Sequence, residues 1–75
     1  MTITYIITKT QARNDGYGYP STTVLYVTTS KEVANEEFKR ITSRAEPHPL
    51  FENVFIETGD EVTSIYRLHE EELMG

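Results

Sequence analysis

The two histidines are the residues of this chain best suited to metal binding or proton transfer. His48 lies between two prolines, and His69 stands 21 residues further along, beside Glu70. Zinc sites usually have ligands at short fixed spacings, such as two histidines on adjacent turns of one helix, and this pair is far from such a spacing. A metal site would need both histidines and a carboxylate to meet in the folded chain. We favour two surface histidines, and we expect no metal ion and no other cofactor.

The serines and glycines form no catalytic or phosphate-binding pattern either. None of the four serines lies in the G-x-S-x-G turn of serine hydrolases, and Gly16-Tyr17-Gly18 lacks the lysine of a phosphate-binding loop. Paired carboxylates occur throughout an acidic chain, so they identify no acid-base pair. We therefore predict that the protein is not an enzyme. A small enzyme or ligand-binding domain would need a deep pocket lined by several polar groups.

The charge balance indicates which partners the protein can bind. Twelve acidic residues outnumber seven basic ones, and the resulting net charge of -5 opposes docking on a phosphate backbone. We therefore expect no direct binding to nucleic acid. A protein partner with a basic or nucleic-acid-binding surface fits this charge better.

Length and composition predict one small domain, residues 1–75, with a single hydrophobic core. No apolar run approaches the about 18 residues that cross a membrane, and the amino terminus lacks the charged and apolar regions of a signal peptide. Without cysteine there is no disulfide and no thiolate metal site. We expect no membrane association and a cytoplasmic protein, in the host cytoplasm if it is viral.

The elements that must position any site begin with a β-hairpin over residues 1–29. Residues 2–9 and 22–29 are rich in β-branched side chains, which is typical of strands. Asp15-Gly16 predicts a two-residue type I′ turn, since both central positions of that turn need positive φ. Facing residue numbers then sum to 31, which places Tyr5 opposite Tyr26 and Ile7 opposite Val24.

A helix is predicted over residues 30–44, ending before two prolines. Thr29 with Glu32 makes a capping box, and Ser30 is the alternative N-cap. The apolar stripe of this helix contains Phe38, and Glu36 and Arg40 have the spacing of an ion pair.

A second hairpin is predicted over residues 51–68, around a turn at Gly59-Asp60 that sets Val54 opposite Ile65 and Glu52 opposite Arg67. The acidic tail, residues 69–75, is expected to form a short helical turn or a frayed end. The fold class is therefore α+β, with an antiparallel sheet of about four strands, one helix on one face, and the order β-β-α-β-β.

One helix cannot cover both faces of the first hairpin, and both faces have large apolar or aromatic side chains. We expect the uncovered face to be the one with Tyr5 and Tyr26, which a second subunit, a partner or the tail would cover. The alternative is that threonines and tyrosine hydroxyls keep this face wet enough to stand alone.

The hairpin tip and one helix position supply the other candidate partner-binding residues. Tyr17 and Tyr19 alternate along the tip near Arg13 and Asp15, and exposed tyrosine and arginine are common anchors of binding sites. Folding back of the tyrosines on their own sheet is the alternative. Glu37 falls inside the apolar stripe of the helix, either as a boundary residue or as a carboxylate that meets a partner's cation.

In layout the chain resembles the small anti-CRISPR proteins that bacteriophages encode against host immunity. The resemblance comprises an opening strand over residues 4–9, a single helix over residues 32–44 and a closing hairpin around residues 54–60. It implies a stoichiometric inhibitor that occludes a surface of a host nucleic-acid-handling complex. Carboxylates interleaved with Lys and Arg favour occlusion over mimicry of phosphates. The alternative is a self-associating accessory domain, a homodimer formed through the uncovered sheet.

Overall fold

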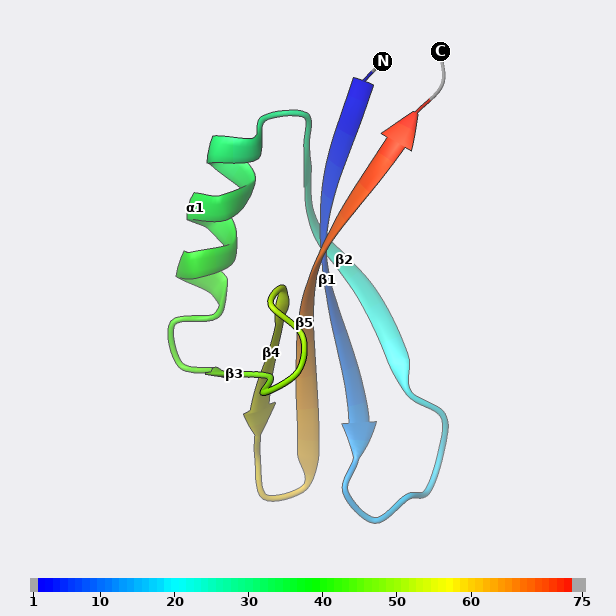
Figure 1. The fold of residues 1–75 in the computed structure, drawn as a ribbon. Helices are drawn as coiled ribbons and strands as arrows, with labels where there is room; N and C mark the ends of the chain where they lie inside the picture. Colours follow the sequence, from blue (N-terminus) through cyan, green and yellow to red (C-terminus); the bar gives the residue numbers. More distant parts are fainter. Residues whose placement is uncertain (1, 74–75) are drawn as a thin grey trace.

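A computed structural model describes residues 2–73, in which one helix covers one face of a five-stranded antiparallel sheet (Figure 1). The elements in chain order are β1 (Thr2–Arg13), β2 (Ser21–Thr28), α1 (Lys31–Ile41), β3 (Glu46–Pro47), β4 (Val54–Thr58) and β5 (Val62–Leu73). The strands lie in the sheet in the order β2-β1-β5-β4-β3. The predicted α+β class with one helix is confirmed. The predicted strand number and order are wrong, because a two-residue strand, β3, follows the helix and pairs with β4.

The centre of the sheet is the pair β1 and β5, which run antiparallel from Thr2 opposite Leu73 to Arg13 opposite Val62. The start of β1 and the end of β5 therefore lie side by side (Figure 1). The prediction of an acidic tail is wrong as far as Leu73, and Met74 and Gly75 lie outside the described residues. Glutamates have low strand propensity, but pairing with the β-branched residues of β1 overrides it.

The register of the first hairpin differs from the prediction. Tyr5 lies opposite Thr28 and Ile7 opposite Tyr26, and a β-bulge then shifts the register so that Thr8 faces Val24. A type I′ turn at Asp15-Gly16 is absent, since no non-glycine residue among those described has positive φ. Instead β1 continues to Arg13, and a longer loop leads to β2. Before the bulge the register slips by two residues, which leaves each side chain on its own face. After the bulge the slip is one residue, which moves Val24 from the face of Ile7 to the face of Thr8.

The register of the second hairpin is shifted by two residues from the predicted one. Val54 faces Arg67 and Ile56 faces Ile65, whereas a two-residue turn would have set Val54 opposite Ile65. The turn is longer than predicted because the Gly59 N–H donates to the Val62 carbonyl at 2.9 Å. The predicted pair of Glu52 and Arg67 does not form, since Glu52 precedes β4.

Helix α1 begins after Ser30, whose Oγ accepts a hydrogen bond from the Val33 N–H at 3.3 Å. It ends at Ile41, three residues before the predicted end at Arg44. The Thr42 hydroxyl donates to the Phe38 carbonyl at 2.6 Å, which satisfies a carbonyl of the last turn. Within residues 2–73 no helix has the length and apolar character needed to cross a membrane.

The core lies between α1 and the sheet. Its buried centre consists of Ile7, Phe38 and Tyr66, and Ile7 has no exposed surface. The rings of Phe38 and Phe55 meet edge to face at 5.4 Å, which fixes the helix over β4 and β5. The half-buried residues packed around this centre are Tyr26, Ile41, Ala45, Phe55 and Leu68.

Candidate interaction surface

The face of the sheet under the helix is the one that contains Tyr5. Tyr5 is 8% exposed, and Tyr26 is half-buried against the core opposite Ile7. The prediction that these two tyrosines lie on the uncovered face is therefore wrong. The helix packs there because Ile7, Leu68 and Tyr66 share the face with Tyr5 and provide the larger apolar surface.

The open face has threonines along β1 and an aliphatic group near β2. Ile6 lies opposite Val27, and Thr8 lies opposite Val24, so these four side chains point away from the helix. The Thr8 hydroxyl and the His69 Nε2 atom are 2.9 Å apart, so His69 has a hydrogen-bond partner on this face. The open face thus has threonine and histidine side chains along β1 and β5, and exposed aliphatic side chains along β2.

Strand β2 is an outer strand of the sheet, and it exposes three aliphatic side chains. Val24 is 57% exposed, Val27 56% and Leu25 38%. The chain has 19 charged residues, and none of them lies in the segment 16–30 that contains β2. We call the outer edge of β2 and these three aliphatic side chains the β2 edge surface. This surface was not predicted from the sequence, although the long uncharged segment indicates it.

Two other free stretches of sheet edge differ from β2 in composition. Strand β3, at the opposite side of the sheet, has only Glu46 and Pro47. Beyond Leu68, strand β5 pairs with β1 but not with β4, and this stretch contains Glu70, Glu71 and Glu72. Proline and charge are the residues with which natural sheets discourage pairing at an edge.

The loop before β2 exposes the two tyrosines that the sequence analysis singled out. Tyr17 is 74% exposed and Tyr19 99%, so neither folds back on the sheet. The Asp15 carboxylate accepts hydrogen bonds from Arg13 Nη2 at 2.6 Å and from the Tyr17 N–H at 2.9 Å. Arg13 and Asp15 thus shape this loop by pairing with each other.

Asn14 anchors the loop to the turn between β4 and β5. Its side-chain N–H donates to the Gly59 carbonyl at 2.9 Å, and its Oδ1 accepts from the Thr63 hydroxyl at 2.5 Å. Its backbone N–H donates to the Glu61 carbonyl at 2.8 Å. These contacts hold the base of the exposed tyrosine loop at one end of the sheet.

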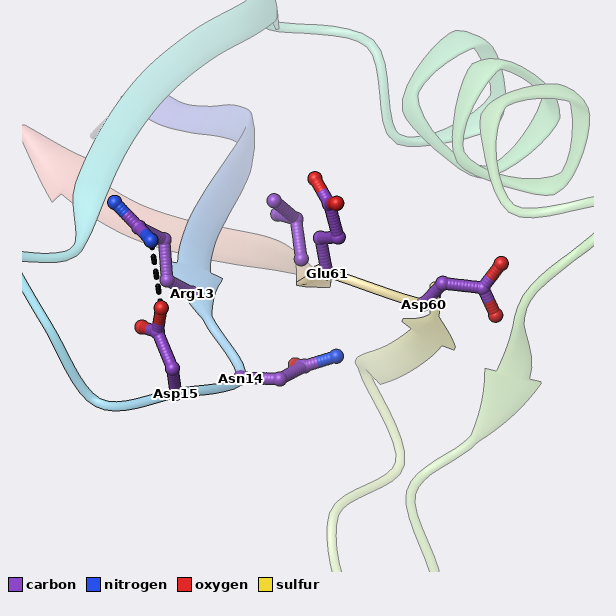
Figure 2. A pocket seen from close by; sticks show the side chains of 6 residues that line it. Arg13, Asn14, Asp15, Asp60 and Glu61 are labelled. Carbon is purple, nitrogen blue, oxygen red and sulfur yellow. Dashed lines mark hydrogen bonds and ion pairs between the residues drawn. The ribbon is translucent and has the colours of Figure 1, made fainter.

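A hollow of about 700 Å³ lies between these two loops, and it is lined by Arg13, Asn14, Asp15, Asp60, Glu61 and Val62. Its carboxylates do not converge: Asp15 pairs with Arg13, and Asp60 points away from both (Figure 2). Within residues 2–73 no three histidine, aspartate or glutamate side chains gather closely enough to hold a metal ion. The hollow is therefore the space between two loops that the hydrogen bonds of Asn14 hold together.

Glu37 already has a cation within its own helix. Arg40 donates to the Glu37 carboxylate from Nη2 at 2.5 Å and from Nε at 3.1 Å. This hydrogen bond, with the negative charge of Glu37, raises the pKa of Arg40. The predicted ion pair of Glu36 and Arg40 is therefore replaced by an i,i+3 pair, and Glu37 is a boundary residue that needs no partner cation.

Two more exposed apolar side chains, which were not predicted from the sequence, lie in the loop between β3 and β4. Leu50 is 81% exposed and Phe51 58%. The ring of His48 lies 4.9 Å from that of Phe51, and its Nδ1 accepts from the Leu50 N–H at 3.0 Å. His48 therefore shapes this loop, while His69 bonds to Thr8 on the open face.

The geometry of residues 2–73 thus offers an edge for strand pairing. No protein-family model matches the chain, and neither a curated protein nor a solved structure matches it. A functional conclusion therefore depends on the physical character of the surface.

Proposed function

We propose that this chain is a non-enzymatic protein-binding module and that its partner binds at the β2 edge surface. The observation that supports this is the contrast between β2, eight uncharged residues with three exposed aliphatic side chains, and the edges protected by proline or glutamate. The unpaired N–H and C=O groups of an edge strand can form a ladder with an added strand. The aliphatic side chains add apolar area that is unfavourable in water.

The charge distribution defines the chemistry of the partner surface. The net charge of -5 arises entirely outside residues 16–30, so the β2 edge surface offers no carboxylate to a basic group. Its partner should therefore present an uncharged strand edge with apolar side chains. Tyr17 and Tyr19, which directly precede β2, would extend the contact as aromatic anchors.

A narrower form of the proposal is an inhibitor of the anti-CRISPR type, which occludes a surface of a host nucleic-acid-handling complex. An uncharged contact surface supports occlusion over mimicry of phosphates, because a mimic needs carboxylates where it binds. The inhibitory activity, the phage origin and the host cytoplasm stay predictions from the resemblance.

Site-specific photo-crosslinking in bacterial cells tests the proposed surface. A photoreactive phenylalanine analogue replaces Thr23 on β2 and, as the control, Glu46 on β3. We expect a discrete adduct from position 23 and none from position 46. Val24→Lys should abolish the adduct. Phe51→Lys, which adds the same charge at a side chain of matching exposure (58% against 57%), should leave it unchanged. No adduct from position 23 would contradict the proposal.

A further inference from the structure

We infer that the partner at the β2 edge surface is a second copy of this chain, whose β2 pairs antiparallel with the first across a two-fold axis. The two five-stranded sheets would then form one continuous sheet. This inference rests on the proposed function and names the occupant of the same surface. It follows from charge, symmetry and strand twist.

Charge restricts where two copies can meet. Each copy has a net charge of -5, so most surface pairings place like charges together. Residues 16–30 are the one long uncharged segment, and they include the whole of β2. In any antiparallel register of Ser21–Thr28 on itself, no charged residue of one β2 lies opposite a charged residue of the other. A basic partner would gain nothing here, since its cations would find no carboxylate.

Symmetry brings aliphatic side chains together. A two-fold axis that makes two copies of β2 antiparallel is perpendicular to the sheet and passes between the two strands. The residue next to the axis therefore lies opposite the same residue of the second copy. Val24 and Leu25 lie at the middle of the eight-residue strand. Directly opposite residues point to the same face, so an aliphatic contact forms at the centre of the interface, with threonines around it. The same operation places both copies of α1 on one face of the joined sheet.

The β-bulge also favours a second copy over an unrelated strand. It lies between Ile7 and Thr8 of β1 and leaves Leu25 of β2 without a partner on β1. A bulge bends its strand and increases the local twist, so a pairing strand must have a matching twist. The second β2 has the same bulge in its middle and therefore the same twist near the axis.

The size of this contact sets the expected affinity. Eight strand residues span about 26 Å, and the loop with Tyr17 and Tyr19 extends each end toward the partner's helix start. Such a strip falls at the low end of specific interfaces, which bury less than about 1,200 Å² in total. We expect a reversible dimer with a dissociation constant on the order of 10 µM.

Sedimentation of the purified chain over a range of concentrations tests the inference. We expect a dimer of twice the 8.6 kDa chain mass, with a dissociation constant raised at least about 10-fold by Val24→Lys and unchanged by Phe51→Lys. Added salt should strengthen this dimer, because it screens repulsion between two negative copies, whereas it would weaken a complex with a basic partner. As a second readout, β2 amides of the wild type should exchange hydrogen more slowly as concentration rises.

The outcomes separate the inference from the proposed function. A wild-type chain that stays monomeric, with an adduct from position 23 of some mass other than the dimer, overturns the second copy and supports a different partner. A monomer without any adduct contradicts both. A dimer that resists Val24→Lys, or whose β2 amides gain no protection, places the contact elsewhere and overturns the inference.

Discussion

The two outer strands of this sheet differ in almost every property that governs pairing. Strand β3 has two residues, one of them a proline that lacks a backbone donor, whereas β2 has eight residues without charge or proline. Both strands belong to one small domain with one core, so stability alone does not explain the difference. A sheet that blocks one side and leaves the other able to pair can form a closed pair of molecules but not an open array.

The stretch of β5 beyond Leu68 supports the same interpretation. It has β1 on one side and no described strand on the other, and three consecutive glutamates occupy it. The bulge in β2 differs from these devices, because it alters the twist of the edge without adding charge or proline. Proline and charge thus occur at β3 and at the end of β5, and both are absent from β2.

The largest effect on stability should come from a side chain in the centre of the core. Ile7 is fully buried between α1 and the sheet. We expect Ile7→Ala to lower the free energy of unfolding by about 3 kcal/mol, a large part of the total for a chain of this size. Urea unfolding should show this loss. Val24→Ala, on the exposed edge, should shift it by less than about 0.5 kcal/mol. Equal losses would mean that β2 belongs to the core.

Removing the protection of β5 should have the next largest effect. Replacement of Glu70, Glu71 and Glu72 by threonine should convert a limited association into growing assemblies, because each molecule then has two edges that pair. Light scattering at increasing concentration should report this growth. The same change at three exposed glutamates off these strands, Glu32, Glu36 and Glu52, alters the net charge equally and should leave the assembly size unchanged.

The smallest effect concerns the link between this acidic edge and the core. Burial, followed by the charge of Glu70 and a hydrogen bond to it, raises the pKa of Tyr5. The stabilisation from neutral Tyr5 is complete below the unfolded value of about 10 and is lost as pH rises through the folded value, because the unfolded chain releases this proton first. Glu70→Gln should lower the pKa of Tyr5 part of the way. Ultraviolet titration, with Tyr5→Phe as reference, measures the shift. An unchanged pKa of Tyr5 would show that Glu70 does not influence it.

The elements of this fold could be predicted from local sequence, but their pairing could not. The β-branched runs located two strands correctly. The N-cap is Ser30, the alternative to the predicted Thr29. The register of the second hairpin slipped by two residues, which preserves the face of every side chain. In the first hairpin the bulge reduces the slip from two residues to one beyond Ile7, and local sequence did not reveal this bulge. The glutamate-rich end of β5 was predicted as a tail, since only its distant partner β1 makes it a strand.

The candidate surface was predicted only in part. The exposed loop with Tyr17 and Tyr19 follows from turn residues outside any apolar run. The choice of face did not follow, because Tyr5 and Ile6 alternate on a strand whose two sides are both apolar. The apolar residues of β5 and β4 decide which side the helix covers, and their position relative to β1 is a tertiary property.

The pairing of β1 with β5 has a consequence for folding during synthesis. Strand β1 acquires its central neighbour only when β5, far along the chain, has been made. Until then the amino-terminal hairpin has two open sides and little enclosed core. Contacts of such long sequence separation slow folding, so the nascent chain should need temporary shielding, and synthesis of the twelve residues of β5 should trigger collapse to the native state.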